Sequence, residues 1–147
     1  MKILVAHDGS AKADKALDVA ADIAGRFGAA LVLVTVVPDL CLSSEEIGAE
    51  GCELVSRSLS EEAGGAMRKV TARLADKGIA AEMVVKDGRP ADAILDAADE
   101  IEADLIVLGS TGKGNAGRWL LGSVAEAVAE VAPVPCLVVR RPEILQA

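Results

Sequence analysis

The sequence predicts a doubly wound α/β domain: a five-stranded parallel sheet with helices on both faces. Short aliphatic runs alternate with segments of helical periodicity along the chain, which is the pattern of successive β-α-β units. The chain is 52% hydrophobic, yet Phe27 and Trp119 are its only aromatic residues, so the core must consist of Ala, Val, Leu and Ile. Such cores are typical of parallel sheets that are buried on both faces. The length of 147 residues fits one domain, residues 1–147.

Each predicted strand is an aliphatic run. The five runs are residues 2–8, 29–37, 80–86, 103–109 and 135–141. The first predicted helix follows Ser10, which can cap it, and stops at Gly28. Residues 39–66 are polar and contain four glycines, so we expect a variable, mobile connection there, leading into a helix with Met67 and Val70 on its apolar face.

The last two predicted helices have recognisable beginnings. Pro90 stands in the first turn of one of them, a position that suits proline. The other begins at Ser123, because Ser123-Val124-Ala125-Glu126 matches the capping-box pattern.

Charge and cysteine content exclude several classes of function. The formal net charge is −8, and an acidic surface repels phosphate backbones and anionic lipids, so we expect neither nucleic acid nor a membrane as partner. No apolar run reaches the roughly 18 residues of a spanning helix, and we expect a cytoplasmic protein. The three cysteines, Cys41, Cys52 and Cys136, lack C-x2-C spacing, which predicts reduced thiols rather than a disulfide framework or a zinc site. His7 is the single histidine, so histidine clusters are excluded.

Two candidate functional features follow predicted strands. Asp8 follows the first strand, and the glycine-rich stretch GSTGKGNAGRWLLGS, residues 109–123, follows the fourth. Ligands of doubly wound sheets bind at the carboxyl ends of the strands, where the strand order reverses. If the first and fourth strands are neighbours, one crevice holds both features.

The glycines of residues 109–123 fit two common phosphate-binding patterns poorly. A Walker A loop requires Gly-x4-Gly-Lys-[Ser/Thr], but Val107 stands at the first glycine position and Gly114 follows Lys113. Gly112, Gly114 and Gly117 form a G-x-G-x-x-G between a strand and a helix. A dinucleotide site is disfavoured, because this unit ends the predicted sheet and no second half follows to hold a nicotinamide.

A third spacing is met without a gap: Gly109-x2-Gly112-x9-Gly122-Ser123. With this motif, and with the stretches ILVAHDGS, DGRPADAILDAA and LLGSVAEAVAEVAPVPCLVVR, nearly the whole chain resembles the ATP-binding branch of the universal stress protein family. The resemblance implies a Rossmann-like fold of the adenine nucleotide alpha hydrolase-like type. It also implies a bound adenine nucleotide, ATP, and a homodimer formed through the C-terminal strand, residues 135–141.

The chemistry of the motif agrees with phosphate binding. A helix that begins at Ser123 offers free N–H groups and a positive dipole end to an anion. Residues 105–125 contain no Asp or Glu and carry Lys113 and Arg118, so they place local positive charge in an acidic protein.

From the resemblance, and for Lys113 from its charge, we expect ten residues at the ligand: Ala6, Asp8, Val36, Leu108, Gly109, Gly112, Lys113, Gly122, Ser123 and Val124. Asp8 would face the ribose or adenine, and the backbone of Val36 would meet adenine. The structural alternatives stay open: Asp8 as a turn former, Ser123 as a helix cap, and the apolar residues as simple packing. His7 stands where the family usually has a small or apolar residue, and the sequence suggests no role for it.

The leading interpretation is an ATP-binding regulatory protein of the stress response with little or slow hydrolysis, Mg²⁺ being brought by the phosphates. The sequence has no Walker B acid, aligned base or arginine finger that would predict fast turnover. A phospho-acceptor domain of the response-regulator type is disfavoured, because it needs paired acids where His7-Asp8 stands. Two alternatives stay open: a cyclic or monophosphate nucleotide as ligand, or a ligand-free module that binds protein partners.

Overall fold

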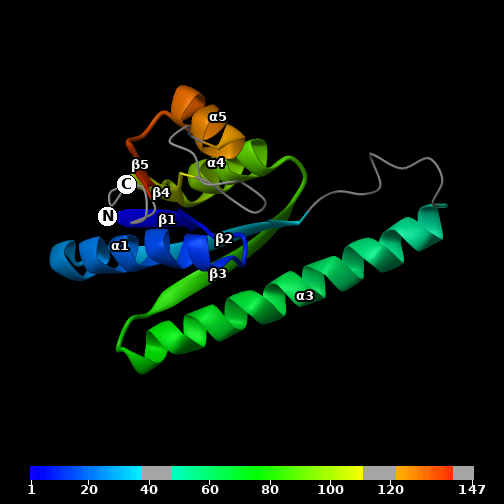
Figure 1. Cartoon of the computed structure of the whole chain (residues 1–147), viewed down its shortest axis with the longest axis horizontal. Coiled ribbons are helices and arrows are strands. Elements are labelled where there is room, and N and C mark those ends of the chain that lie inside the picture. Colours follow the sequence, from blue (N-terminus) through cyan, green and yellow to red (C-terminus); the bar gives the residue numbers. More distant parts are fainter. Residues whose placement is uncertain (38–47, 111–121, 141–147) are drawn as a thin grey trace, which may run out of the picture.

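The computed structural model describes residues 1–37, 48–110 and 122–140. The strands are β1 (Lys2–Ala6), β2 (Ala30–Val37), β3 (Ala81–Asp87), β4 (Leu105–Gly109) and β5 (Cys136–Val139). The helices are α1 (Ala11–Phe27), α3 (Ala49–Asp76), α4 (Pro90–Ile101) and α5 (Ser123–Val131). Helices and strands alternate along the described chain, as the sequence predicts (Figure 1).

The sheet has five strands in the order β3-β2-β1-β4-β5. All neighbouring strands are parallel, and β1 is the central strand, with Leu4 opposite Val32 of β2 on one side and Ile106 of β4 on the other. The predicted fold class is therefore confirmed. The first and fourth strands are neighbours, which is the condition that one shared crevice required.

Helices cover both faces of the sheet, α1 and α3 on one side and α4 and α5 on the other (Figure 1). Side chains of a strand alternate between the faces, so neighbouring residues of β1 enter different cores. Ile3 and Val5 pack against α1 and α3, whereas Leu4 packs against α4 and α5. All three are fully buried.

Helix α3 departs from the sequence-based expectation. It begins at Ala49 and runs for 28 residues, so most of the connection expected over 39–66 is helical. Each glycine costs a helix about 1 kcal/mol relative to alanine. Because α3 contains Gly51, Gly64 and Gly65, the sequence did not predict a helix there, although its other residues are mostly good helix formers. The apolar face expected from Met67 and Val70 continues to Leu74, and all three residues are buried against the sheet. In Figure 1 the N-terminal part of α3 extends beyond the sheet.

The cysteines differ from one another in chemical state. Cys136 is a free thiol, and burial raises its pKa. Cys52, buried near the start of α3, is disulfide-bonded. The expectation of reduced thiols is therefore wrong for Cys52, because a spacing rule on the sequence does not report which sulfurs meet in the fold; Cys41 lies outside the described residues.

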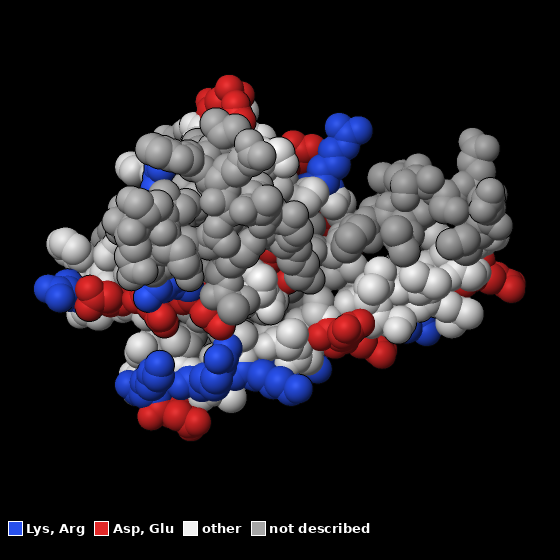
Figure 2. Space-filling model, viewed as in Figure 1, with Lys and Arg blue, Asp and Glu red and all other residues white. Residues whose placement is uncertain are grey.

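The face seen in Figure 2 carries charged side chains of both signs, and basic ones gather over the C-terminal half of α3, which contains Arg68, Lys69 and Arg73. Among the described residues, no helix combines the length and apolar character that crossing a membrane requires.

The buried aliphatic residues of the sheet should dominate stability. Leu33 of β2 is fully buried, so Leu33→Ala is expected to lower the free energy of unfolding by about 3 kcal/mol through lost burial and a cavity. Urea denaturation measures this loss. The same substitution at Leu54, which is 65% exposed on α3, is the control and should change stability by less than about 0.5 kcal/mol. Equal losses at the two positions would contradict the assignment of the core.

Candidate functional site

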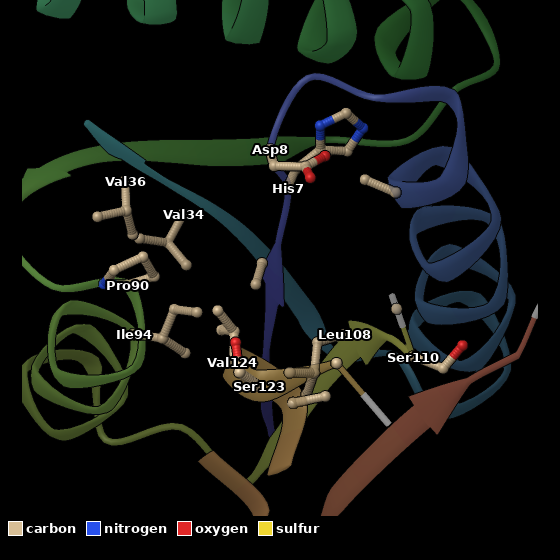
Figure 3. A pocket seen from close by; sticks show the side chains of 15 residues that line it. His7, Asp8, Val34, Val36, Pro90, Ile94, Leu108, Ser110, Ser123 and Val124 are labelled. Carbon is tan, nitrogen blue, oxygen red and sulfur yellow. The ribbon is translucent and has the colours of Figure 1, made fainter. Parts of the chain in front are cut away.

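A cavity of about 340 Å³ opens at the carboxyl ends of β1, β2 and β4 (Figure 3). The residues that line it are Ala6, His7, Asp8, Ala13, Val34, Val36, Pro90, Ile94, Leu108, Gly109, Ser110, Gly122, Ser123, Val124 and Ala125. The strand order reverses between β1 and β4, because the connections from these strands lead to opposite edges of the sheet. The cavity therefore lies at the topological switch point, where doubly wound sheets bind ligands.

The cavity has an apolar side and a polar side. In Figure 3, Val34 and Val36 of β2 lie beside Pro90 and Ile94 from the first turns of α4, and together they form an aliphatic wall. The polar groups come from the β1–α1 turn, the end of β4 and the start of α5. Such a division suits a ligand with a flat apolar part and a polar part.

The start of α5 supplies backbone donors. Gly122 is the N-cap, in an extended conformation with φ −65° and ψ 156°, and its carbonyl accepts the Glu126 N–H at 3.0 Å. The first N–H groups of a helix have no partner within the helix and carry its positive dipole end. Both Ser123 and Val124, the first two residues of α5, line the cavity.

The predicted capping role of Ser123 is wrong. The helix does begin at Ser123, but Ser123 is its first helical residue and no side chain caps the helix. The cap shifts by one residue because the Gly122 N–H is held by the Ser110 carbonyl, which places Gly122 at the N-cap position. Since its hydroxyl does not cap α5, Ser123 can offer that hydroxyl to a ligand.

Ser110 is a site residue that the sequence analysis missed. It is 3% exposed, directly follows β4, and its N–H donates to the Val139 carbonyl at 2.9 Å. Its buried Oγ has no hydrogen-bond partner among the residues that the structure describes. A buried hydroxyl without a partner is costly, so it indicates a position where a ligand can complete the hydrogen bonding. The available signal was its place, a polar residue immediately after an aliphatic strand.

Asp8 combines a turn role with a place in the cavity wall. Its Oδ1 accepts hydrogen bonds from the Ser10 N–H at 2.9 Å and from the Ser10 hydroxyl. Ser10 in turn caps α1, as predicted, by accepting the Ala13 N–H at 3.3 Å. The turn-forming alternative for Asp8 is thus realised, and the same carboxylate lines the cavity.

The structure brings eight of the ten expected ligand residues to one cavity: Ala6, Asp8, Val36, Leu108, Gly109, Gly122, Ser123 and Val124. Gly112 and Lys113, together with Arg118 and Trp119, lie outside the described residues. Besides Ser110, the sequence analysis missed Val34, Pro90 and Ile94, because their part in the wall depends on the order of the strands and the path of α4. Within the described ranges, no group of three or more His, Cys, Asp or Glu residues is arranged to hold a metal ion.

Fold and cavity together define the chain as a doubly wound α/β protein with a cavity at its switch point, one side of which presents a helix N-terminus. The family model of the universal stress protein family matches residues 1–140, and the chain belongs to that family.

Known proteins resemble the chain over nearly its whole length. Universal stress protein MJ0531 of Methanocaldococcus jannaschii is 39% identical over 145 residues, which cover 97% of this chain and 83% of that protein. The solved structure of universal stress protein UspA from Lactobacillus plantarum is 31% identical and superposes with a TM-score of 0.83, covering 95% of this chain and 97% of that one.

Two further solved relatives contain nucleotides. One is a universal stress protein in complex with cAMP, 28% identical, with a TM-score of 0.68 and coverage of 95% and 96% of the two chains. The other is the universal stress protein from Archaeoglobus fulgidus in complex with dAMP, 26% identical, with a TM-score of 0.60 and coverage of 95% and 98%. Members of the family with this fold thus bind nucleotides.

The unpartnered Ser110 hydroxyl predicts an unusual stability effect. Ser110→Ala removes a buried polar group that lacks a hydrogen bond, so the ligand-free protein is expected to become more stable by about 1 kcal/mol. Urea denaturation of nucleotide-stripped protein measures the difference. Ser123→Ala, at an exposed position, is the control and should stay within about 0.5 kcal/mol. A clear loss of stability in Ser110→Ala would mean that the hydroxyl is already satisfied in the free protein.

Proposed function

We propose that the chain is a nucleotide-binding regulatory protein of the stress response that holds ATP in the switch-point cavity. The observation that carries the proposal is the buried Ser110 hydroxyl, which has no partner within the described ranges, beside the N-terminal end of α5 and across from an aliphatic wall. The nucleotide complexes of two relatives support it.

Different groups of residues would bind the adenine and the phosphates of ATP. Adenine would lie against Val34, Val36 and Ile94, with the backbone of Val36 at its edge. The phosphates would meet the first N–H groups of α5, the Ser110 and Ser123 hydroxyls and, from the glycine motif, Gly109, Gly112 and Lys113.

Asp8 would accept hydrogen bonds from the ribose hydroxyls. A carboxylate suits this role because it accepts stronger hydrogen bonds than a neutral side chain. Its Oδ1 is engaged by Ser10, so the ribose would find a carboxylate whose direction the turn already fixes. Asp8 is the one acidic residue among the described residues that line the cavity, so the protein offers Mg²⁺ a single carboxylate there. Mg²⁺ would therefore be held mainly by the phosphates and enter with them.

Turnover is expected to be slow or absent. Fast phosphoryl transfer needs a group that orients water on the terminal phosphate and charges that stabilise the transition state. Of the described lining residues, His7 and Asp8 are the titratable ones, and both are engaged in the β1–α1 turn. The expected function is therefore to sense or carry the nucleotide, and a cytoplasmic location stays a prediction.

A cyclic or monophosphate nucleotide is the second candidate ligand. The observation that favours it is that cAMP and dAMP, each with a single phosphate, are the ligands of the two relatives. A module that binds protein partners without any nucleotide is the remaining alternative.

Identification of a co-purified ligand separates these candidates. Freshly purified protein is denatured, and the released small molecules are identified by chromatography and mass spectrometry. ATP or ADP supports the leading proposal, and a cyclic or monophosphate nucleotide supports the second. An empty protein that also fails to bind added ATP, cAMP or dAMP in calorimetry would overturn both.

The N-cap glycine of α5 offers a sharp test of the phosphate site. Gly122→Val is expected to abolish nucleotide binding and leave the fold intact, because φ −65° and ψ 156° suit valine but its side chain would occupy the space before the helix N-terminus. Isothermal titration calorimetry measures the binding. Gly48→Val is the matched control: Gly48 is the N-cap of α3 with φ −62° and ψ 163°, it lies outside the cavity, and binding should be unchanged. The idea is falsified if Gly122→Val binds as tightly as the parent.

We further propose a homodimer formed through the C-terminal strand, residues 135–141. Its described part, β5, stands at an edge of the sheet, and Leu137 is 37% exposed there. An exposed aliphatic edge strand tends to pair with another strand, and a two-fold axis would join two copies of β5.

A charge on this edge should prevent pairing. Leu137→Lys is expected to lower the mass in light scattering from twice 15.0 kDa to that of one chain, because two lysines would face each other across the axis. Leu54→Lys, on the exposed part of α3, is the control and should remain dimeric. A parent protein of 15.0 kDa at all concentrations would rule out the dimer.

A further inference from the structure

His7 is a buried titratable residue to which the proposed function gives no part. It is 3% exposed at the carboxyl end of β1, and both of its ring nitrogens are engaged. Nδ1 accepts a hydrogen bond from the Gly9 N–H at 3.0 Å, and Nε2 lies 2.9 Å from Asp14 Oδ1 of α1. Because Nδ1 accepts, it carries no proton, and the proton lies on Nε2, which donates to the carboxylate. The hydrogen-bond pattern therefore assigns the neutral Nε2–H tautomer.

The bond to Gly9 acts on the turn that carries Asp8. Gly9 has φ +85°, a conformation that few other residues adopt, and it lies between Asp8 and the α1 cap Ser10. His7 therefore restrains the turn from one side of Asp8, whereas the bonds from Ser10 to Asp8 Oδ1 restrain it from the other. A turn held on both sides presents its carboxylate in one direction, and such preorganisation raises affinity by reducing the ordering cost of binding.

The ring of His7 is directed away from the place of the nucleotide. In Figure 3 it points away from the aliphatic residues Val36 and Ile94. Its side chain is only 2% exposed, and both nitrogens are occupied by protein groups, so it has no nitrogen free to move a proton to or from a ligand. The ring thus acts on the site through the backbone.

We propose that His7 is a positioning residue for nucleotide binding: through Nδ1 it holds the Gly9 N–H and thereby fixes the direction of the Asp8 carboxylate. Asp14 supports it by selecting the Nε2–H tautomer, which leaves Nδ1 free to accept. This inference rests on the proposed nucleotide site, because Asp8 is positioned for the ribose only if a nucleotide occupies the cavity.

Two amide substitutions separate the two nitrogens of the ring. The side-chain oxygen of Asn in His7→Asn can take the place of Nδ1 and accept the Gly9 N–H. The longer Gln side chain in His7→Gln places its amide near Nε2 and keeps only the bond to Asp14. We expect His7→Asn to bind ATP within about threefold of the parent, and His7→Gln to bind about tenfold more weakly. A purely structural role of the buried ring predicts equal affinities for the two variants.

The support from Asp14 has a matched control on the same helix. Asp14→Ala removes the acceptor of Nε2–H, so the tautomer is no longer fixed and affinity for ATP is expected to fall about threefold to tenfold. Asp14→Asn keeps an acceptor oxygen and should restore most of the affinity. Asp22→Ala removes another α1 carboxylate, one that pairs with exposed Arg26, and should leave affinity unchanged.

A spectroscopic readout tests the tautomer without any ligand. His7 is the only histidine, so ¹⁵N-histidine labelling gives one set of ring signals with no assignment problem. We expect the spectrum of a neutral ring protonated at Nε2. An Nδ1–H tautomer in the folded protein at neutral pH would overturn the proposal by itself.

The outcomes distinguish this inference from the proposed function. A parent that binds no nucleotide overturns the proposed function and this inference with it. A parent that binds ATP, with His7→Asn and His7→Gln equal in affinity and thermal stability, overturns only the positioning role. If His7→Gln fails to fold, the tautomer of the parent and the Asp14→Ala and Asp14→Asn affinities decide the question.

Discussion

The parallel pairing of β1 with both β2 and β4 is the constraint on which the rest of the structure depends. From β1 the chain crosses α1 to β2 at one side, whereas β4 arrives on the other side after α4. Right-handed crossovers on the two sides of a central strand place their helices on opposite faces, so the connections diverge at the carboxyl end of β1. The gap between them is the cavity, and the alternation of buried residues along β1 supplies the cores that hold both layers.

The two sides of that cavity differ in how well their polar groups are satisfied. On the β1–α1 side, hydrogen bonds from Gly9 and Ser10 and the cap of α1 fix the turn. On the β4–α5 side, counting only the described residues, the Ser110 hydroxyl has no partner and no side chain caps α5. A buried polar group without a partner is rare in folded proteins, and a water molecule or a ligand can complete its hydrogen bonding. Under the proposed function, the rigid side would orient a nucleotide and the incomplete side would be completed by its phosphates.

Most of the fold could be predicted from the sequence because aliphatic runs and helical spacing are local patterns. The same patterns failed where tertiary contacts decide. Helix α3 begins at Ala49 despite its glycines, since its C-terminal half packs on the sheet. Ser123 matches a capping box, yet the bond from the Gly122 N–H to Ser110 shifts the cap by one residue. Likewise, Ser110, Val34 and Pro90 line the cavity only because β1 lies between β2 and β4. Local sequence patterns do not predict the order of the strands.

If the proposed function holds, this acidic protein binds a polyanion through short-range hydrogen-bond donors. The net charge of −8 repels phosphate at long range, but salt screens charges over about 8 Å at physiological ionic strength. Among the described residues, the donors on the phosphate side of the cavity are backbone N–H groups of α5 and two serine hydroxyls, none of which carries a formal charge. Asp8 stands on the opposite, β1 side of the cavity, where a ribose rather than a phosphate would meet it. In the proposed complex, the one carboxylate among the described lining residues would therefore mark the sugar end of the nucleotide and set its direction in the cavity.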